Sequence, residues 1–78
     1  MNNTIYTLKD YGKININLKQ IMKDKGISRS KLSSMSAMNY DLVNRYYNNR
    51  VIRVDLDVIA RFCYVLDCSV NDVLEYSK

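Results

Sequence analysis

The chain has 78 residues, with twelve Lys and Arg, eight Asp and Glu, no His, no Pro and two Cys. A chain of this length buries only roughly 60% of its unfolded surface, so we expect a single domain with a small helical core. Cys63 and Cys68 are too few for a disulfide framework or, without histidine, for a four-ligand zinc site. Lacking His also removes the commonest general base, so we predict no enzyme activity, no catalytic residues, no metal and no cofactor.

The net charge of +4 is unevenly distributed along the chain. Residues 1–53 hold ten basic side chains and three acidic ones, whereas residues 54–78 hold two basic and five acidic ones. A basic surface suits nucleic acid, a membrane headgroup layer or an acidic protein, and the charge alone leaves these three partners open.

The sequence contains no targeting or membrane signal that we recognise. No apolar run approaches the roughly 20 residues that a membrane-spanning helix needs. The first residues lack the basic and apolar regions of a secretory signal, so we expect a cytoplasmic protein with reduced thiols.

The first sixteen residues carry a weak strand signal. Two short strands around a turn at 9–12 would use the apolar residues Ile5, Leu8, Ile14 and Ile16, with Gly12 ending the turn. A flexible arm or an edge strand used in dimerisation fits nearly as well. We therefore expect an N-terminal arm or short strand region at 1–12, followed by a domain at 13–78.

A helix is predicted over 17–25, with Asn17 as its N-cap. Its apolar stripe consists of Leu18, Ile21 and Met22. Gly26 is suited to end this helix because glycine readily takes the left-handed conformation after a C-cap.

A helix-start pattern follows four times, with an apolar residue, a polar N-cap and a second apolar residue five positions after the first. The four sets are Ile27, Ser28, Leu32; Met38, Asn39, Val43; Val54, Asp55, Ile59; and Cys68, Ser69, Val73. In each set the cap oxygen can accept from a backbone N–H of the first turn, while the apolar pair packs as a hydrophobic staple. The pattern predicts helices over 28–35, 39–47, 55–66 and 69–76.

The helix at 55–66 is expected to supply much of the core. Its predicted buried face comprises Leu56, Ile59, Ala60, Phe62, Cys63 and Leu66. The helices at 28–35 and 39–47, joined by three residues, form a helix-turn-helix at about 28–47, in which the second helix can enter a major groove.

Two stretches of the chain together resemble the lambda-repressor-like family of Cro and phage repressors, also called Xre regulators. The first is ISRSKLSSMSAMNYDLVNRYYNNR, in which Leu32 and Val43 match buried positions of the family and Ala37 stands at its turn glycine. The second is VDLDVIARFCYVLDCSVNDVLEY, which is similar to short single-domain members. The resemblance covers about residues 13 to 76. It implies an all-α, five-helix lambda-repressor-like fold.

The resemblance implies which residues contact DNA. The start of the recognition helix reads base edges in this family, which points to Tyr40, Asp41, Asn44 and Arg45. The family's phosphate contacts correspond to the start of the helix at 28–35, to the N-cap of the helix at 39–47 and to the loop that follows it. In this chain these residues are Ser28, Arg29, Lys31, Asn39, Asn48, Asn49, Arg50 and Arg53. Arg45 could bind guanine, Asn44 adenine and Asp41 the cytosine amino group.

Simpler roles compete with several of these assignments. Arg45 could equally contact phosphate, and Asp41 could interact with the positive end of the helix dipole. Asn48 and Asn49 could only close the helix, since Asn tolerates the left-handed conformation. Tyr46 and Tyr47 are expected in the core or at its rim.

The chain also departs from the family pattern at four positions. Ala37 replaces glycine, Arg29 replaces glutamine, Tyr47 replaces glutamate and Asp67 replaces a helix-ending glycine. If the turn keeps a positive φ, Ala37 bears strain of about 1 kcal/mol.

The function implied by the resemblance is a sequence-specific transcriptional regulator, expected to be a repressor that occupies operator DNA. The analogy also implies a homodimer on a palindromic site, with contacts from residues 4–16 or from Val70, Val73, Leu74 and Tyr76. No small-molecule ligand or membrane partner is expected. A second interpretation is a protein-interaction or antitoxin-like regulatory module on the same fold.

Overall fold

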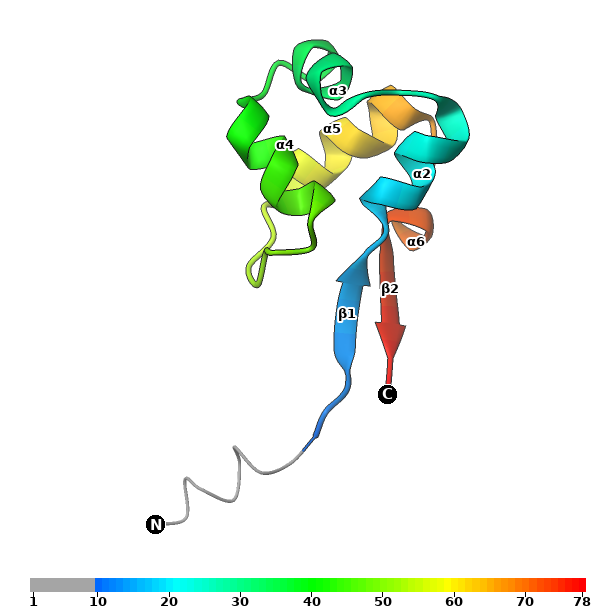
Figure 1. Cartoon of the computed structure of the whole chain (residues 1–78). Helices are drawn as coiled ribbons and strands as arrows, with labels where there is room; N and C mark the ends of the chain where they lie inside the picture. The colour runs from blue at the N-terminus through cyan, green and yellow to red at the C-terminus, as the bar shows by residue number, and fades with distance from the viewer. Residues whose placement is uncertain (1–9) are drawn as a thin grey trace.

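The computed structural model describes residues 10–78. Its elements, in chain order, are β1 (Lys13–Ile16), α2 (Leu18–Lys25), α3 (Arg29–Met35), α4 (Tyr40–Tyr47), α5 (Leu56–Leu66), α6 (Val70–Val73) and β2 (Leu74–Ser77). The helices form the body of the molecule, and the two strands extend from one side of it (Figure 1). Over the described residues this is the mostly helical, lambda-repressor-like fold that the resemblance implied, with a small sheet added.

Local capping explains where most of the helices begin. The side chains of Ser28, Asn39 and Asp55 accept hydrogen bonds from backbone N–H groups of α3, α4 and α5, at 3.1, 2.7 and 2.9 Å. These three N-caps are confirmed. Asn17 precedes α2 as expected, but its side chain makes no cap bond and instead donates to Glu75 at 3.2 Å.

The helix ends follow the same local logic. Gly26 ends α2 in the left-handed conformation at φ 67°, as predicted, and the N–H of Ile27 reaches back to the carbonyl of Met22 at 3.0 Å. Asp67 takes the left-handed conformation after α5, at φ 51°. It thus holds the conformation of the glycine that it replaces.

The core lies where α2, α3, α4 and α6 meet α5. Its buried residues are Ile16, Leu18, Met22, Leu32, Val43, Tyr46, Val58, Ile59, Phe62, Leu66 and Val73. The predicted face of α5 was partly wrong, because Leu56 is 79% exposed and Ala60 is exposed, whereas Val58 is buried. Apolar residues surround most of this helix, so their spacing did not determine which side turns inward.

The predicted helix at 69–76 was also partly wrong. The helical turn α6 ends at Val73, whose carbonyl accepts from the N–H of Asn17 at 2.7 Å, and residues 74–77 form β2. Strand β2 pairs antiparallel with β1, placing Ile16 opposite Leu74 and Lys13 opposite Ser77. The chain after a helix can become a strand when another strand lies beside it and supplies the backbone hydrogen bonds.

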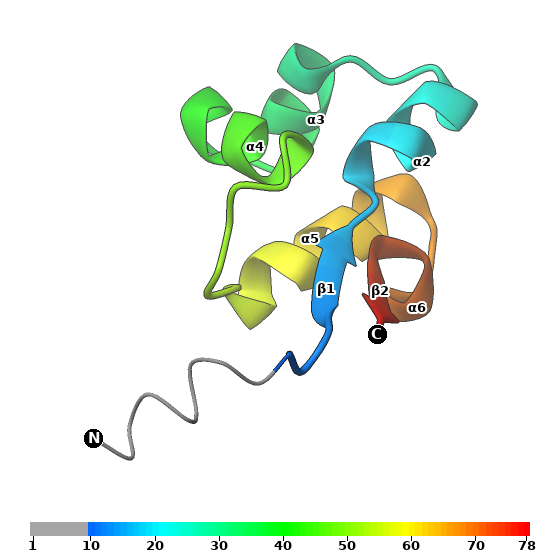
Figure 2. The same ribbon diagram turned by 60° about the horizontal axis from the view of Figure 1, so that its bottom comes forward.

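Only the second strand of the hairpin expected around residues 9–12 falls within the described residues. The strand carrying Ile14 and Ile16 exists, but its partner among the described residues is β2 (Figure 2). Ile5 and Leu8 lie outside the described residues. Gly12 has φ 83°, and a Cβ there would lie 2.5 Å from the carbonyl oxygen of Ser77, so close strand approach requires glycine.

Candidate nucleic-acid interface

Helices α3 and α4 form a helix-turn-helix through a tight, strained turn. Ala37 has φ 54°, the left-handed conformation anticipated from its place at the family's glycine. The N–H of Met38 donates to the carbonyl of Ser33 at 3.0 Å, and the buried Ser36 hydroxyl donates to the carbonyl of Leu32. The turn therefore retains its shape without glycine because these hydrogen bonds hold it.

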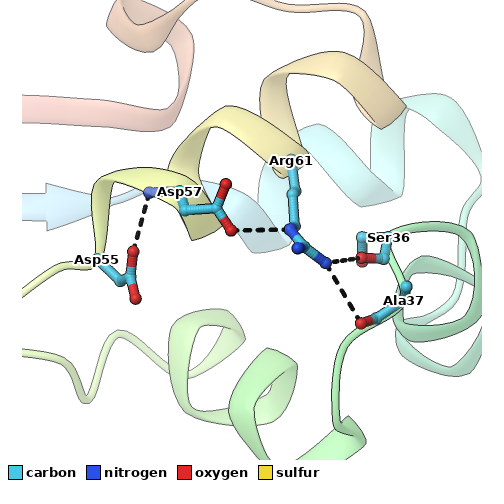
Figure 3. A network of polar contacts seen from close by, with 5 residues as sticks. All are labelled: Ser36, Ala37, Asp55, Asp57 and Arg61. Atoms are coloured by element: carbon cyan, nitrogen blue, oxygen red, sulfur yellow. Dashed lines mark hydrogen bonds and ion pairs between the residues drawn. The ribbon is translucent and has the colours of Figure 1, made fainter.

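A side chain from α5 braces the same turn (Figure 3). Nη1 of Arg61 donates to the carbonyl oxygen of Ser36 at 2.9 Å and of Ala37 at 3.4 Å. Nε of Arg61 donates to Asp57 at 2.9 Å, one helical turn away. Sequence reasoning missed this brace. The spacing of Asp57 and Arg61 signals an ion pair on α5, but nothing local indicates the contact with the turn.

Two buried residues fix the rotation of α4. Val43 is fully buried, and the ring of Tyr46 packs edge-on against Phe62 with centroids 5.4 Å apart. The hydroxyl of Tyr46 accepts from the N–H of Asp55 at 3.1 Å. Tyr46 is thus a core residue, as expected, and its position turns the opposite side of α4 outward.

The four predicted base-contacting residues differ in their exposure and in how far other side chains already occupy their polar atoms. Tyr40, Asp41 and Arg45 are exposed on α4. Asn44 is half-buried, and its Oδ1 accepts from Nη1 of Arg29 at 2.6 Å and from Nδ2 of Asn48 at 3.3 Å. These bonds occupy both acceptor sites of the Asn44 carbonyl, whereas bidentate recognition of adenine needs one of them.

Arg29 is held by a second contact besides the one with Asn44. Its guanidinium carbon lies 4.4 Å from the ring centroid of Tyr47, and Nζ of Lys19 lies 5.2 Å from the same centroid. Both distances fall within the range of cation–π attraction. The half-buried Tyr47 ring therefore gathers two cations beside the N-terminus of α3. The sequence predicted Tyr47 in the core or at its rim, but it gave no indication of the contact with Lys19.

Five more of the predicted phosphate contacts fall into two groups. Ser28, Lys31 and Asn39 are exposed at the starts of α3 and α4, where two of them also serve as caps. Arg50 and Arg53 are exposed in the loop after α4. Together with Arg45 of α4, this loop forms a hollow that is lined by three arginines, by Val51 and by Ile52. Ile52 is 99% exposed within it.

Asn48 and Asn49 have structural partners. Nδ2 of Asn48 donates to the carbonyl of Asn44 at 3.0 Å, which closes α4. Asn49 is left-handed at φ 58°; its Oδ1 accepts from the N–H of Ile16 at 3.0 Å, and its Nδ2 donates to Asn15 at 3.3 Å. Asn49 thus ties the exit of α4 to β1, a contact that sequence reasoning did not identify.

The thiols and acids outside this surface have local explanations. Cys63 and Cys68 are free and half-buried, and burial raises the pKa of the Cys68 thiol. Hydrogen bonds from Ser69 hold the pKa of the Asp72 carboxyl below its usual value. Within residues 10–78 no group of His, Cys, Asp and Glu is arranged to hold a metal ion. None of the described helices is long and apolar enough to cross a membrane.

The fold and the exposed edge of α4 define a helix-turn-helix protein. Residues 17–78 match the Cro/C1-type HTH DNA-binding domain. Because this match covers most of the chain, the protein belongs to the Cro/C1-type helix-turn-helix family, a family of DNA-binding regulator domains. The comparison with curated proteins found no match.

Several solved structures are similar to this chain. A Bacteroides fragilis protein assigned provisionally to DNA binding superposes with a TM-score of 0.72 at 13% identity, over 81% of this chain and 100% of that one. The transcriptional regulator VanUg gives a TM-score of 0.68 at 19% identity, over 90% of this chain and 93% of that one. The SinR/SinI protein complex gives 0.66 at 25% identity, over 70% of this chain and 53% of that one, so the match spans about half of that chain.

Proposed function

We propose that the protein is a sequence-specific transcriptional regulator that represses by occupying operator DNA through α4. The observation that carries this proposal is the exposure of Tyr40, Asp41 and Arg45 on one side of α4. Val43 and Tyr46 anchor the other side in the core. A helix held in this way presents a fixed set of polar side chains to a major groove.

Base recognition is assigned to the four residues predicted from the sequence. Arg45 donates to guanine, Asp41 accepts from the cytosine amino group and Tyr40 contacts a thymine methyl group. Asn44 contributes through its amide nitrogen, because Arg29 and Asn48 occupy its oxygen. Asn44 is therefore a weaker adenine reader than the sequence alone implied.

Phosphate contacts are assigned to both flanks of α4. Arg29, Lys31, Ser28 and Asn39 serve the side of the α3 N-terminus, while Arg50 and Arg53 serve the loop. Asn48 and Asn49 contribute backbone N–H groups at most, because their side chains hold α4 and β1. The family membership and this cationic surface support a DNA partner over a membrane surface.

The proposal also covers the extent of the DNA-binding domain, the localisation of the protein and its oligomeric state. The DNA-binding domain is assigned to residues 13–78, and the protein is proposed to act in the cytoplasm as a homodimer. The arm or strand region expected at 1–12 lies for the most part outside the described residues. It is a binding protein and not an enzyme. A protein-interaction module is the second candidate function, and the similarity to chains of the SinR/SinI complex supports it.

Salt dependence separates the two candidates. Fluorescence anisotropy with labelled duplexes from a random pool should show binding at low salt that weakens steeply as salt is added, because each neutralised phosphate releases counterions. Replacing Arg50 and Arg53 together by Ala should lower both the affinity and the salt slope. Lack of DNA binding at low salt would reject the DNA proposal and favour the protein-interaction module.

A further inference from the structure

Two cysteines flank the end of α5. Cys63 lies in the C-terminal part of this helix, Cys68 follows the left-handed Asp67, and both cysteines are free and half-buried. The N–H of Cys68 donates to the carbonyl of Cys63 at 3.1 Å. This bond and the left-handed residue before it form a Schellman motif, which frequently brings the side chains of the two bonded residues into contact.

The same motif ends α2, where it joins a different pair of residues. After the left-handed Gly26, the N–H of Ile27 donates to the carbonyl of Met22 at 3.0 Å. Met22 is buried in the core and Ile27 packs against it. At the end of α5 the equivalent positions hold two cysteines. The arrangement that packs two apolar side chains after α2 therefore brings together two groups that can react with each other after α5.

The backbone bond also limits the distance between the two cysteines. With standard bond lengths, an N···O distance of 3.1 Å leaves the Cα atoms of Cys63 and Cys68 at most about 7 Å apart. Disulfides usually join residues whose Cα atoms are about 4.4–6.8 Å apart. Burial raises the pKa of the Cys68 thiol, and the nearby Cys63 thiol adds to this rise, in agreement with a short distance between the sulfur atoms.

Small molecules can reach the pair through a hollow beside Cys68. The hollow has a volume of about 600 Å³ and lies between α2 and the corner that joins α5 to α6. None of the residues assigned to DNA is among its lining residues. Its charged lining residues are Asp24, Lys25, Asp67, Asp72 and Glu75. Because acidic side chains exceed basic ones there, a neutral or cationic reagent is favoured over an anionic one.

We propose that Cys63 and Cys68 form a reversible intramolecular disulfide by exchange with small neutral or cationic disulfides. The thiolate of one cysteine attacks a sulfur of the small disulfide, which forms a mixed disulfide and releases one small thiolate. The thiolate of the other cysteine then attacks the protein sulfur of the mixed disulfide and releases the second small thiolate. The protein loses two electrons and two protons, and the small disulfide is reduced to two thiols.

The disulfide would reinforce the corner between α5 and α6. Cys68 directly precedes Ser69, whose capping box with Asp72 begins α6. The carbonyl of Val73, at the end of α6, accepts from the N–H of Asn17 and so connects this corner to the start of α2. In reducing compartments such disulfides are usually transient and sense oxidants, so the free thiols are the resting state. This inference goes beyond the proposed function and requires no DNA.

Exchange equilibria of the full chain test the proposal directly. The protein is equilibrated with known ratios of 2-hydroxyethyl disulfide to 2-mercaptoethanol and quenched with acid, and its remaining thiols are counted by alkylation and mass spectrometry. Wild type should accumulate the intramolecular disulfide without bound mercaptoethanol. Cys63→Ser and Cys68→Ser should each stop at the mixed disulfide, because the second attacking thiol is missing.

A matched control moves one thiol to the neighbouring position on α5. The variant Cys63→Ser, Tyr64→Cys keeps two thiols at nearly the same separation along the chain, but position 64 is 88% exposed and faces away from the body. Its intramolecular disulfide should have an equilibrium constant at least about tenfold lower than that of wild type. Circular dichroism establishes that the variant keeps the wild-type helix content. Equal constants for the two proteins would overturn the proposal.

Urea provides a test that needs no variant. Unfolding removes the Schellman motif, so the constant for closing the disulfide in wild type should fall at least about tenfold in the unfolded chain. By linkage, oxidation should raise the folding equilibrium constant by the same factor. A disulfide equally stable in the folded and unfolded chains, or a folded wild type that accumulates only mixed disulfides, would contradict the proposal. A wild type that closes the disulfide but does not bind DNA would uphold it and reject only the proposed function.

Discussion

Nη1 of Arg29 donates a hydrogen bond to Oδ1 of Asn44 across 2.6 Å, joining the first residue of α3 to the middle of α4. This bond connects a residue assigned to phosphate with one assigned to bases. The ring of Tyr47 also contacts this guanidinium, whose carbon lies 4.4 Å from the ring centroid. Phosphate contact and base reading are therefore expected to be coupled.

A double-mutant cycle on DNA affinity tests this coupling. We expect Arg29→Ala and Asn44→Ala to be non-additive by about 0.5–3 kcal/mol, since each change alone leaves the other side chain misplaced. The matched pair Lys31→Ala and Asn44→Ala should be additive, because Lys31 is exposed and is not joined to Asn44. If the effects of Arg29→Ala and Asn44→Ala were also additive, the hydrogen bond between these two side chains would have no role in DNA binding.

The strain at Ala37 predicts a stabilising substitution. Ala37→Gly should raise the free energy of unfolding by about 1 kcal/mol, because glycine adopts φ 54° without a Cβ penalty. Thermal unfolding should show an increase of about 4–8 °C in Tm. Ser34→Gly within α3 is the control and should lower Tm instead. A lower Tm for Ala37→Gly would mean that the turn is not strained at this residue.

Arg61 should stabilise the helix-turn-helix through the geometry of its guanidinium. Arg61→Lys retains the charge opposite Asp57 but cannot donate in the same fork to Asp57 and Ser36, so the free energy of unfolding should fall by about 1 kcal/mol. Urea unfolding at a low micromolar protein concentration measures this change. Arg53→Lys, in an exposed loop position, should remain within about 0.5 kcal/mol of wild type. Equal stabilities for the two variants would rule out the brace.

The capping box at α6 predicts a specific pH dependence. Hydrogen bonds from the backbone and side chain of Ser69 lower the folded-state pKa of Asp72 below its reference value of 3.8. Its contribution to stability is therefore fully present above that value and is lost as the pH falls through the folded-state pKa. Wild type should be more stable than Asp72→Asn at pH 6, and the difference should diminish below pH 3.8. A difference that is constant with pH would contradict this cause.

The sequence predicted those parts of the fold that depend on neighbouring residues. Caps such as Ser28 and Asn39 are satisfied within one helical turn, so their pattern appears directly in the sequence. Ala37 has a positive φ, which is the condition under which the sequence predicted strain at this residue. Local hydrogen bonds thus mark where these helices begin, including the one assigned to DNA.

The parts that were missed depend on contacts between distant residues. Strand β2 forms because β1 lies beside it, although the two are about sixty residues apart in the chain. Asn49 bonds to Ile16 across 33 positions, so a predicted phosphate contact has an internal partner that no local pattern reveals. Leu56 was expected in the core because α5 is apolar on most sides, and only the packed structure shows which side faces outward.

The central claim is that α4 reads a DNA sequence while the following loop binds phosphate. The most direct test measures the affinities of Arg45→Ala and Arg50→Ala for a duplex selected by wild type from a random pool and for an unselected duplex. Arg45→Ala should weaken binding to the selected site by about 1–3 kcal/mol with little effect on the other, whereas Arg50→Ala should weaken both alike. Equal losses on the two duplexes for Arg45→Ala, or a pool without an enriched sequence, would contradict the account.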